Sequence, residues 1–195
     1  MSLTDFFTLS LSLILIENFV LARFLGVTPL LAASKKMHSA AGMCLSILVA
    51  MTLSSALGWC VNEFLLLPFS LEYMQTVALV LVIVTVVEVC GMLLKRFTPA
   101  LYGSAADYQP LVIANCAVLG AAMLGAGGEH SLVYAVVYGA MAALGFLLAI
   151  VLLASIRERL EFSDCPACFE GFPIALVTAG LLAMAFMGFQ GLKVF

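Results

Sequence analysis

The sequence predicts an all-α integral membrane protein with six transmembrane helices. Its composition is the first reason, because 65% of the residues are hydrophobic, only 10% are charged, and the mean hydropathy is +1.21. An ordinary globular domain carries about a quarter charged residues. A chain with this few charged residues cannot cover a surface that faces water. We therefore expect lipid around the chain. The small net charge of −3 argues against nucleic-acid binding, and Met1–Asp5 lacks the positive segment of a signal peptide.

Six apolar runs are the second reason, since a hydrocarbon core of ~30 Å takes ~20 helical residues to cross. The runs lie near Leu3–Leu25, Ala40–Cys60, Gln75–Leu94, Gln109–Gly125, Leu132–Ser155 and Pro173–Gly191. The fourth run is short, and the first continues through Gly26 to Pro29, where a proline ring disfavours an unbroken helix. These features predict broken half-helices in the first and fourth spans.

The basic residues predict the orientation of the spans. Six of the eight follow spans one, three and five, and they are Lys35, Lys36, Lys95, Arg96, Arg157 and Arg159. The alternate loops, Val61–Met74 and Ala126–Ser131, contain none. Because cytoplasmic loops are enriched in Lys and Arg, the three basic loops are predicted to be cytoplasmic and both termini to lie outside.

The chain is predicted to form one polytopic membrane domain over 1–195, built from two repeats of three spans, about 1–100 and 101–195. An odd number of spans in each half gives the halves opposite orientations. Asn18-Phe19-Val20-Leu21 in the first half is similar to Asn115-Cys116-Ala117-Val118-Leu119 in the second. Inverted repeats of this kind place functional sites near the bilayer midplane.

Polar residues inside the apolar runs are the candidate site. Asn115 and Cys116 lie at the centre of the fourth run, where Cys116 is either a buried structural thiol or a ligand. Asn18 and Asn115 are expected to bond the backbone groups that a helix break frees. Glu17 is an intramembrane carboxylate, and Arg23, six residues further along, would lie on another face of a continuous helix. Glu17 is therefore read either as an ion- or proton-handling group or as a carboxylate that is protonated or bonded to a partner subunit.

Glu88, in the third span, is open to the same two readings, and its place near the cytoplasmic end favours the second. In the loop before the last span, Cys165-Pro166-Ala167-Cys168 supplies two thiols without the further ligands that a zinc or iron–sulfur site needs. A free or redox-labile pair of thiols is the favoured interpretation. The sequence contains no dinucleotide-binding fingerprint and no run of four cysteines, so we expect no NAD, flavin or haem site in this chain.

Several motifs together resemble the RnfA family of membrane subunits, which includes the RsxA and NqrE proteins. The motifs, which span nearly the whole chain in order, are Asn18-Phe19-Val20-Leu21, Phe24-Leu25-Gly26, Pro29, Ser34-Lys35-Lys36, Asn115-Cys116-Ala117-Val118-Leu119-Gly120, Ile156-Arg157-Glu158-Arg159-Leu160, Ala175-Leu176-Val177-Thr178-Ala179-Gly180 and Ala185-Phe186-Met187-Gly188-Phe189. The resemblance implies a membrane subunit of the Rnf complex, a translocase-type oxidoreductase that couples electron flow between ferredoxin and NAD to Na⁺ or H⁺ transport. It also implies a bacterial or archaeal cytoplasmic (inner) membrane, and RnfB-, RnfC-, RnfD-, RnfE- and RnfG-like partners.

The resemblance further implies a 2Fe–2S cluster inside the membrane, shared with the inverted, homologous RnfE-like subunit. One of the family's two cysteine ligands maps onto Cys116, and the other maps onto Thr28, where this chain has a hydroxyl. A hydroxyl is a poor cluster ligand because its oxygen stays protonated. Thr28 could be a rare oxygen ligand, Cys44 or Cys90 could substitute, or the cluster could be altered or absent. Gly26, Pro29, Asn18 and Asn115 would support the site.

Two other function classes stay open. A non-redox transporter or channel would use Glu17 and Glu88 as coupling residues. A scaffold subunit would need neither these carboxylates nor Cys116, and the hydroxyl of Thr28 makes this class more credible. The chain alone holds no complete active site in any of the three interpretations.

Overall fold

The computed structural model describes residues 3–34, 37–97, 109–127, 131–160, 162, 166, 169 and 171–191. Every regular element within these residues is a helix, so the predicted all-α class is confirmed. In chain order they are α1 (Leu3–Leu11), η1 (Ser12–Ile16), α2 (Val27–Ala33), α3 (Met37–Val61), η2 (Asn62–Leu66), η3 (Glu72–Met74), α4 (Gln75–Phe97), α6 (Gln109–Ile113), α7 (Cys116–Ala126), α8 (Leu132–Leu160), α9 (Phe172–Met187) and η4 (Gly188–Gly191).

Four helical segments among the described residues are long and apolar enough to cross a membrane. They are Met43–Leu66, Gln75–Leu93, Gln109–Ala126 and Leu132–Leu160, and they match the predicted second to fifth spans. The first and sixth predicted spans correspond to shorter apolar helices, Phe6–Ile16 and Phe172–Met187. A helix of 16 residues is about 24 Å long, which is less than the ~30 Å of a hydrocarbon core. The count of six spans therefore stays a prediction.

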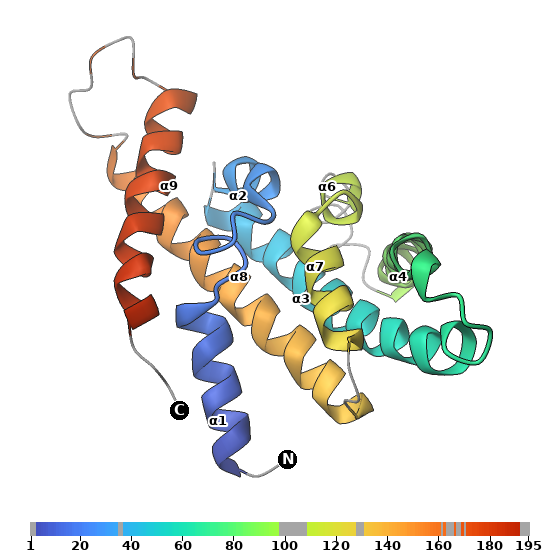
Figure 1. The fold of residues 1–195 in the computed structure, drawn as a ribbon. Helices are drawn as coiled ribbons and strands as arrows, with labels where there is room; N and C mark the ends of the chain where they lie inside the picture. Colours follow the sequence, from blue (N-terminus) through green and yellow to red (C-terminus); the bar gives the residue numbers. More distant parts are fainter. Residues whose placement is uncertain are drawn as a thin grey trace.

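The two longest helices, α3 and α8, pack against each other and form the centre of the molecule (Figure 1). Small side chains allow this close approach, as is common between membrane helices. A Cβ added to Gly139 of α8 would lie 2.8 Å from the Cβ of Ser55 and 2.9 Å from the carbonyl oxygen of Met51, both in α3. The Ser55 hydroxyl donates to the carbonyl oxygen of Ala135 at 2.7 Å. This pair of helices is the support on which the shorter elements lie.

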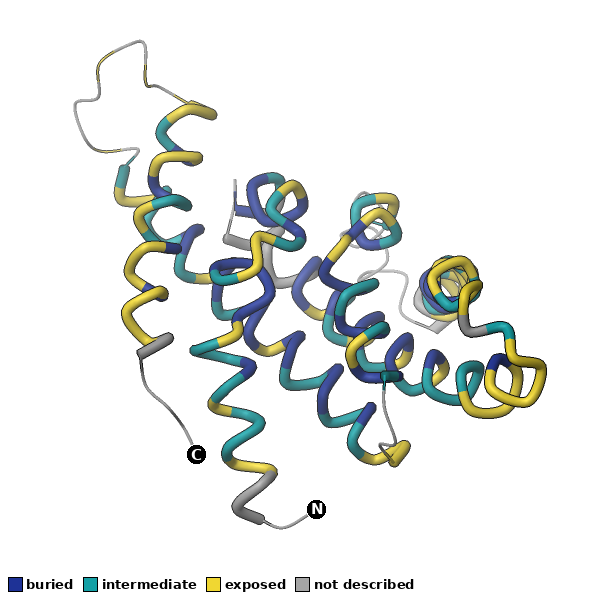
Figure 2. Tube along the Cα trace, in the orientation of Figure 1, coloured by how far each residue is buried: buried dark blue, intermediate teal, exposed yellow. Residues whose placement is uncertain are grey.

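Burial divides the helices into an inner group and an outer group (Figure 2). The inner group includes α7, half of which is buried, and the facing sides of α3 and α8. The outer group includes α4 and α9, which expose large apolar side chains such as Leu81 and Met92 of α4 and Phe172, Leu181 and Met184 of α9. Apolar surface on this scale would be unusual on a soluble monomer, and it agrees with a protein whose solvent is lipid.

The first predicted span is broken, but not where the sequence analysis placed the break. Helix ends at Ile16, the chain turns through 17–26, and α2 begins at Val27. Pro29 is the third residue of α2, where its missing N–H costs nothing because the first-turn N–H groups have no partner within the helix. Pro29 therefore belongs to the start of the second half-helix, and the break itself precedes it.

Candidate functional site

The fourth predicted span is broken at Ala114 and Asn115, between α6 and α7. Asn115 is the N-cap of α7, with extended backbone angles (φ −81°, ψ 110°), and its Oδ1 accepts a hydrogen bond from the Ala117 N–H at 2.9 Å. Asn115 thus bonds a backbone N–H group that the helix break frees. Its Nδ2 is buried and has no hydrogen-bond partner among the described residues. Buried side-chain amides without a hydrogen-bond partner are uncommon, because burying an unpaired N–H group lowers the stability of the folded protein.

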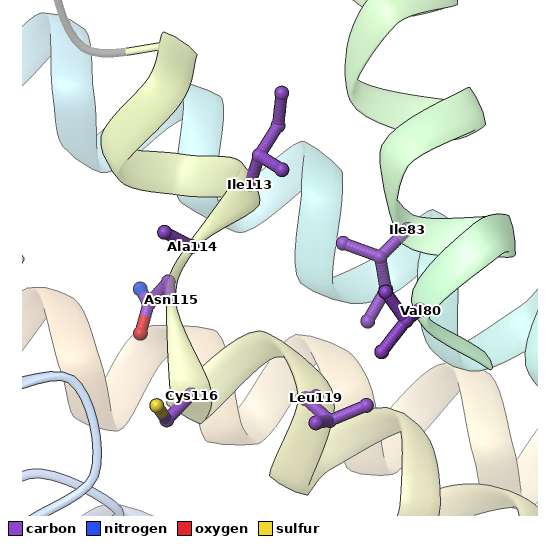
Figure 3. Close-up of a pocket in the computed structure, with 7 residues that line it drawn as sticks. All are labelled: Val80, Ile83, Ile113, Ala114, Asn115, Cys116 and Leu119. Carbon is purple, nitrogen blue, oxygen red and sulfur yellow. The ribbon is translucent and has the colours of Figure 1, made fainter. Parts of the chain in front are cut away.

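Cys116 is the first residue of α7, and it is exposed on the surface of this chain. In the first turn of α7, the Ala117 N–H donates to the Asn115 Oδ1 and the Val118 N–H donates to the Asn115 carbonyl oxygen at 3.1 Å. A pocket of about 200 Å³ lies at the break, and the residues that line it are Val80, Ile83, Ile113, Ala114, Asn115, Cys116 and Leu119. Figure 3 shows Leu119 directed toward Val80 and Ile83 of α4, and Asn115 and Cys116 directed away from that helix.

The first break is held by Asn18, which is fully buried. Its Oδ1 accepts from the N–H groups of Val20 and Leu21 at 3.0 and 3.2 Å. Its Nδ2 donates to the carbonyl oxygens of Ile14 at 3.0 Å and Gly145 at 2.7 Å. Asn18 thus ties the end of η1 and the first residues of the break to α8, and it bonds backbone groups that the break frees.

The two breaks meet at Gly26. This residue has φ +78°, and a Cβ on it would lie 2.5 Å from the Asn115 Oδ1, 2.8 Å from the Phe146 ring and 3.2 Å from the Ala117 Cβ. Only glycine fits both the left-handed backbone and the space. Thr28, two residues further, is exposed on α2. The structure therefore brings the Gly26 end of the first break against Asn115, and Thr28 and Cys116 each lie near that contact on an exposed position.

Glu17 and Arg23 form an ion pair, which corrects the expectation from the sequence that they lie on different faces. The Arg23 Nη2 is 2.7 Å from the Glu17 Oε2, and both side chains are about half exposed, at 38% and 50%. The guanidinium also lies over the Phe19 ring, 5.6 Å from its centroid. The expectation assumed a continuous helix from Glu17 to Arg23. The helix instead stops at Ile16, and the chain turns through 17–26.

The other candidate residues do not gather at the breaks. Glu88 is exposed on α4, Cys44 is buried in the core of α3, and Cys90 is half-buried. The described part of the chain contains no group of three or more His, Cys, Asp or Glu side chains arranged to hold a metal. Cys165 and Cys168 lie outside the described residues.

Two residues at the breaks were missed by the sequence analysis. Gly145 supplies the carbonyl oxygen that accepts from Asn18, and a Cβ on it would lie 2.9 Å from the Leu13 carbonyl oxygen. Phe146 places its ring against Gly26. Both belong to the long apolar run of α8, and nothing in the local sequence separates them from ordinary packing residues.

Comparison with known proteins identifies the family. Residues 6–193 match the profile of the family described as "Rnf-Nqr subunit, membrane protein". The chain is 46% identical over 193 residues (99% of this chain, 100% of the relative) to a Yersinia enterocolitica protein named as the A component of an ion-translocating oxidoreductase complex. It is 48% identical over 183 residues (94% and 95%) to an Acetobacterium woodii protein named as the A component of a Na(+)-translocating ferredoxin:NAD(+) oxidoreductase complex. An Edwardsiella ictaluri protein with the same name as the Yersinia relative is 45% identical over 193 residues (99% and 100%). The resemblance drawn from the motifs is confirmed, and the chain belongs to the Rnf–Nqr family of membrane subunits.

Proposed function

We propose that the chain is the RnfA-type component of an ion-translocating ferredoxin:NAD oxidoreductase complex and that it relays electrons at the break between α6 and α7. The observation that carries the proposal is Cys116, an exposed thiol on the first residue of a half-helix inside an apolar protein. Family membership and the names of the relatives support the complex and its reaction class.

The residues at the two breaks fit a shared iron–sulfur cluster only in part. Cys116 would be the ligand from this chain, and its exposed position leaves room for a second subunit to supply others. Thr28 lies on an exposed position of the other half-helix but offers a protonated hydroxyl in place of a thiolate. A bound cluster would supply one-electron transfer between redox centres on the two sides of the membrane. The protein's own part would be to hold Cys116 at the start of α7, beside a pocket lined mainly by apolar side chains.

The proposed setting is a bacterial or archaeal cytoplasmic (inner) membrane, with both termini outside. The order of elements supports an inverted repeat of about 1–100 and 101–195, because each half has a broken apolar segment followed by a long helix and a further apolar helix. An RnfE-like homologue is the proposed partner at the cluster, and RnfB-, RnfC-, RnfD- and RnfG-like subunits would complete the complex. The complex as a whole would move the transported ion, Na⁺ or H⁺.

A scaffold or non-redox transport role is the second candidate, and Thr28 favours it because a family thiolate position carries no thiolate. In the transport form, Glu17 and Glu88 would be the coupling residues. The ion pair with Arg23 weakens the case for Glu17 as a cation site, since a cation would have to displace a guanidinium 2.7 Å away. Glu88 has an exposed side chain that a partner protein or an ion could reach.

The test is the iron content and the reduced-state EPR spectrum of the purified complex, for wild type, Cys116→Ala and Thr28→Cys. We expect a cluster signal in wild type that is lost in Cys116→Ala, with the complex still assembled. Cys44→Ala is the matched control, because this thiol is buried in α3 and should leave the signal unchanged. A wild-type complex without this cluster, in which Thr28→Cys creates the signal, would contradict the proposal and favour the scaffold or transport role.

A further inference from the structure

The half-helix α2 is too short to hold its own position. It has seven residues, and Gly26 at its N-cap has no side chain with which to cap it. Isolated helices of fewer than about 12 residues are marginal even in favourable sequences, so tertiary contacts must fix α2. Its apolar side supplies some of them, because Pro29, Leu30 and Leu31 are buried.

The C-terminal end of α2 is held by Arg157, which lies near the end of α8. The Arg157 Nη1 donates to the Leu31 carbonyl oxygen at 3.0 Å and to the Ser34 Oγ at 2.8 Å. The Ser34 hydroxyl in turn donates to the Leu31 carbonyl oxygen at 3.2 Å. These three groups close a ring of hydrogen bonds, and Ser34 is only 2% exposed. We call this ring the α2 clasp.

A positively charged side chain is well suited to the C-terminal end of α2, where Arg157 lies. The last carbonyl groups of a helix lack N–H partners and carry partial negative charge, so a guanidinium there both satisfies the carbonyl and complements the helix dipole. A hydrogen bond from a charged donor is stronger than one between neutral groups. The bonds join residues 126 and 123 positions apart in the chain, so they tie the two halves of the sequence together.

The other end of α2 begins next to Gly26. The Asn115 Oδ1 occupies the space that a side chain on Gly26 would need, and Asn115 is the N-cap of α7, the helix that carries Cys116. A shift of α2 would therefore open the contact between the two breaks. We propose that Arg157 is a positioning residue that locks α2 through its C-terminal end and so fixes the surroundings of Cys116. The inference rests on the proposed function only where it concerns the redox signal at Cys116; the clasp itself can be tested without it.

The test is hydrogen–deuterium exchange in the intact complex, read on peptides that cover 27–34. Arg157→Gln should raise exchange of these amides by roughly tenfold or more, because the charge-assisted bonds are lost. Ser34→Ala, which removes one acceptor, should give a smaller rise. Arg159→Gln is the matched control: Arg159 is exposed, two residues further along α8. Exchange that stays at the wild-type rate in Arg157→Gln, or that rises equally in Arg159→Gln, would overturn the inference.

A spectroscopic measurement separates positioning from mere stabilisation. Arg157→Gln should shift the reduced-state EPR spectrum at unchanged iron per complex, and Arg157→Lys should restore it, since an ammonium can donate to both acceptors. If Arg157→Gln fails to assemble, Ser34→Ala carries the same two measurements. Faster exchange with an unaltered spectrum would contradict the positioning role. A wild-type complex that lacks the cluster would refute the proposed function instead, and the exchange result alone would then decide whether the clasp exists.

Discussion

The two helix breaks use the same residue type, and they differ in how completely it is bonded. Asn18 makes four hydrogen bonds at the first break, to Val20, Leu21, Ile14 and Gly145. Asn115 makes one within the described part of the chain, the cap of Ala117, and leaves its Nδ2 buried without a partner there. The first break is thus a fully bonded joint. The second keeps a buried amide N–H without a partner next to an exposed thiol, and an unpaired buried polar group in a native structure calls for an explanation.

The largest expected difference between the breaks appears when each asparagine is replaced by leucine, which has a similar size. Asn18→Leu removes four hydrogen bonds and leaves two buried backbone N–H groups unpaired, so we expect the free energy of unfolding to fall by about 4 kcal/mol. Asn115→Leu removes one cap and should cost about 1 kcal/mol. Denaturant unfolding of the purified protein in detergent measures both values. Equal losses at the two positions would remove the distinction between the breaks.

The next largest effect is expected where the breaks touch. Gly26→Ala places a Cβ 2.5 Å from the Asn115 Oδ1 on a backbone with φ +78°, so we expect a loss of about 2–3 kcal/mol. Gly180→Ala is the matched control, because no atom lies within 4 Å of its added Cβ and alanine favours the α9 helix. Thermal unfolding of both variants compares them. A Gly26→Ala variant as stable as Gly180→Ala would show that the breaks do not pack as described.

The smallest effect is expected at the ion pair beside the first break. Glu17 and Arg23 are about half exposed, so a double-mutant cycle with Glu17→Gln and Arg23→Gln should give a coupling energy of less than about 1 kcal/mol. We also expect Glu17→Gln to leave the iron content of the complex unchanged. Loss of iron in this variant would mean that the first break takes part in the chemistry assigned to the second.

The sequence predicted the features that depend on composition and local pattern. Six apolar runs were predicted to be spans, and four of them correspond to long apolar helices among the described residues. The asparagine in each broken span marked where backbone groups would be freed. Asn-Cys at the centre of a short run was enough to locate the second break. These predictions succeeded because the length of an apolar run and a buried amide act on their immediate neighbours in the chain, whereas Pro29 misplaced the first break.

Contacts between distant segments could not be predicted in this way. The pairing of Glu17 with Arg23 required knowledge that the helix stops at Ile16, and periodicity alone assumes that it continues. The contact of Gly26 with Asn115 depends on how the halves pack. Arg157 served only to predict orientation and as part of a family motif, because a basic residue near the end of an apolar run gives no sign that it bonds a carbonyl 126 residues away.

The most direct test of the account is the amount of iron per folded complex in Cys116→Ser, measured together with its thermal stability and compared with Asn18→Ser. The account predicts that Cys116→Ser loses the cluster iron while the complex stays folded and assembled, because Cys116 is exposed and its own packing contributes little; its unfolding temperature should fall only by what the bound cluster contributes. Asn18→Ser should unfold at a lower temperature and retain iron in the fraction that stays folded. A Cys116→Ser complex that keeps its full iron content and EPR signal would contradict the assignment of the chemistry to the second break.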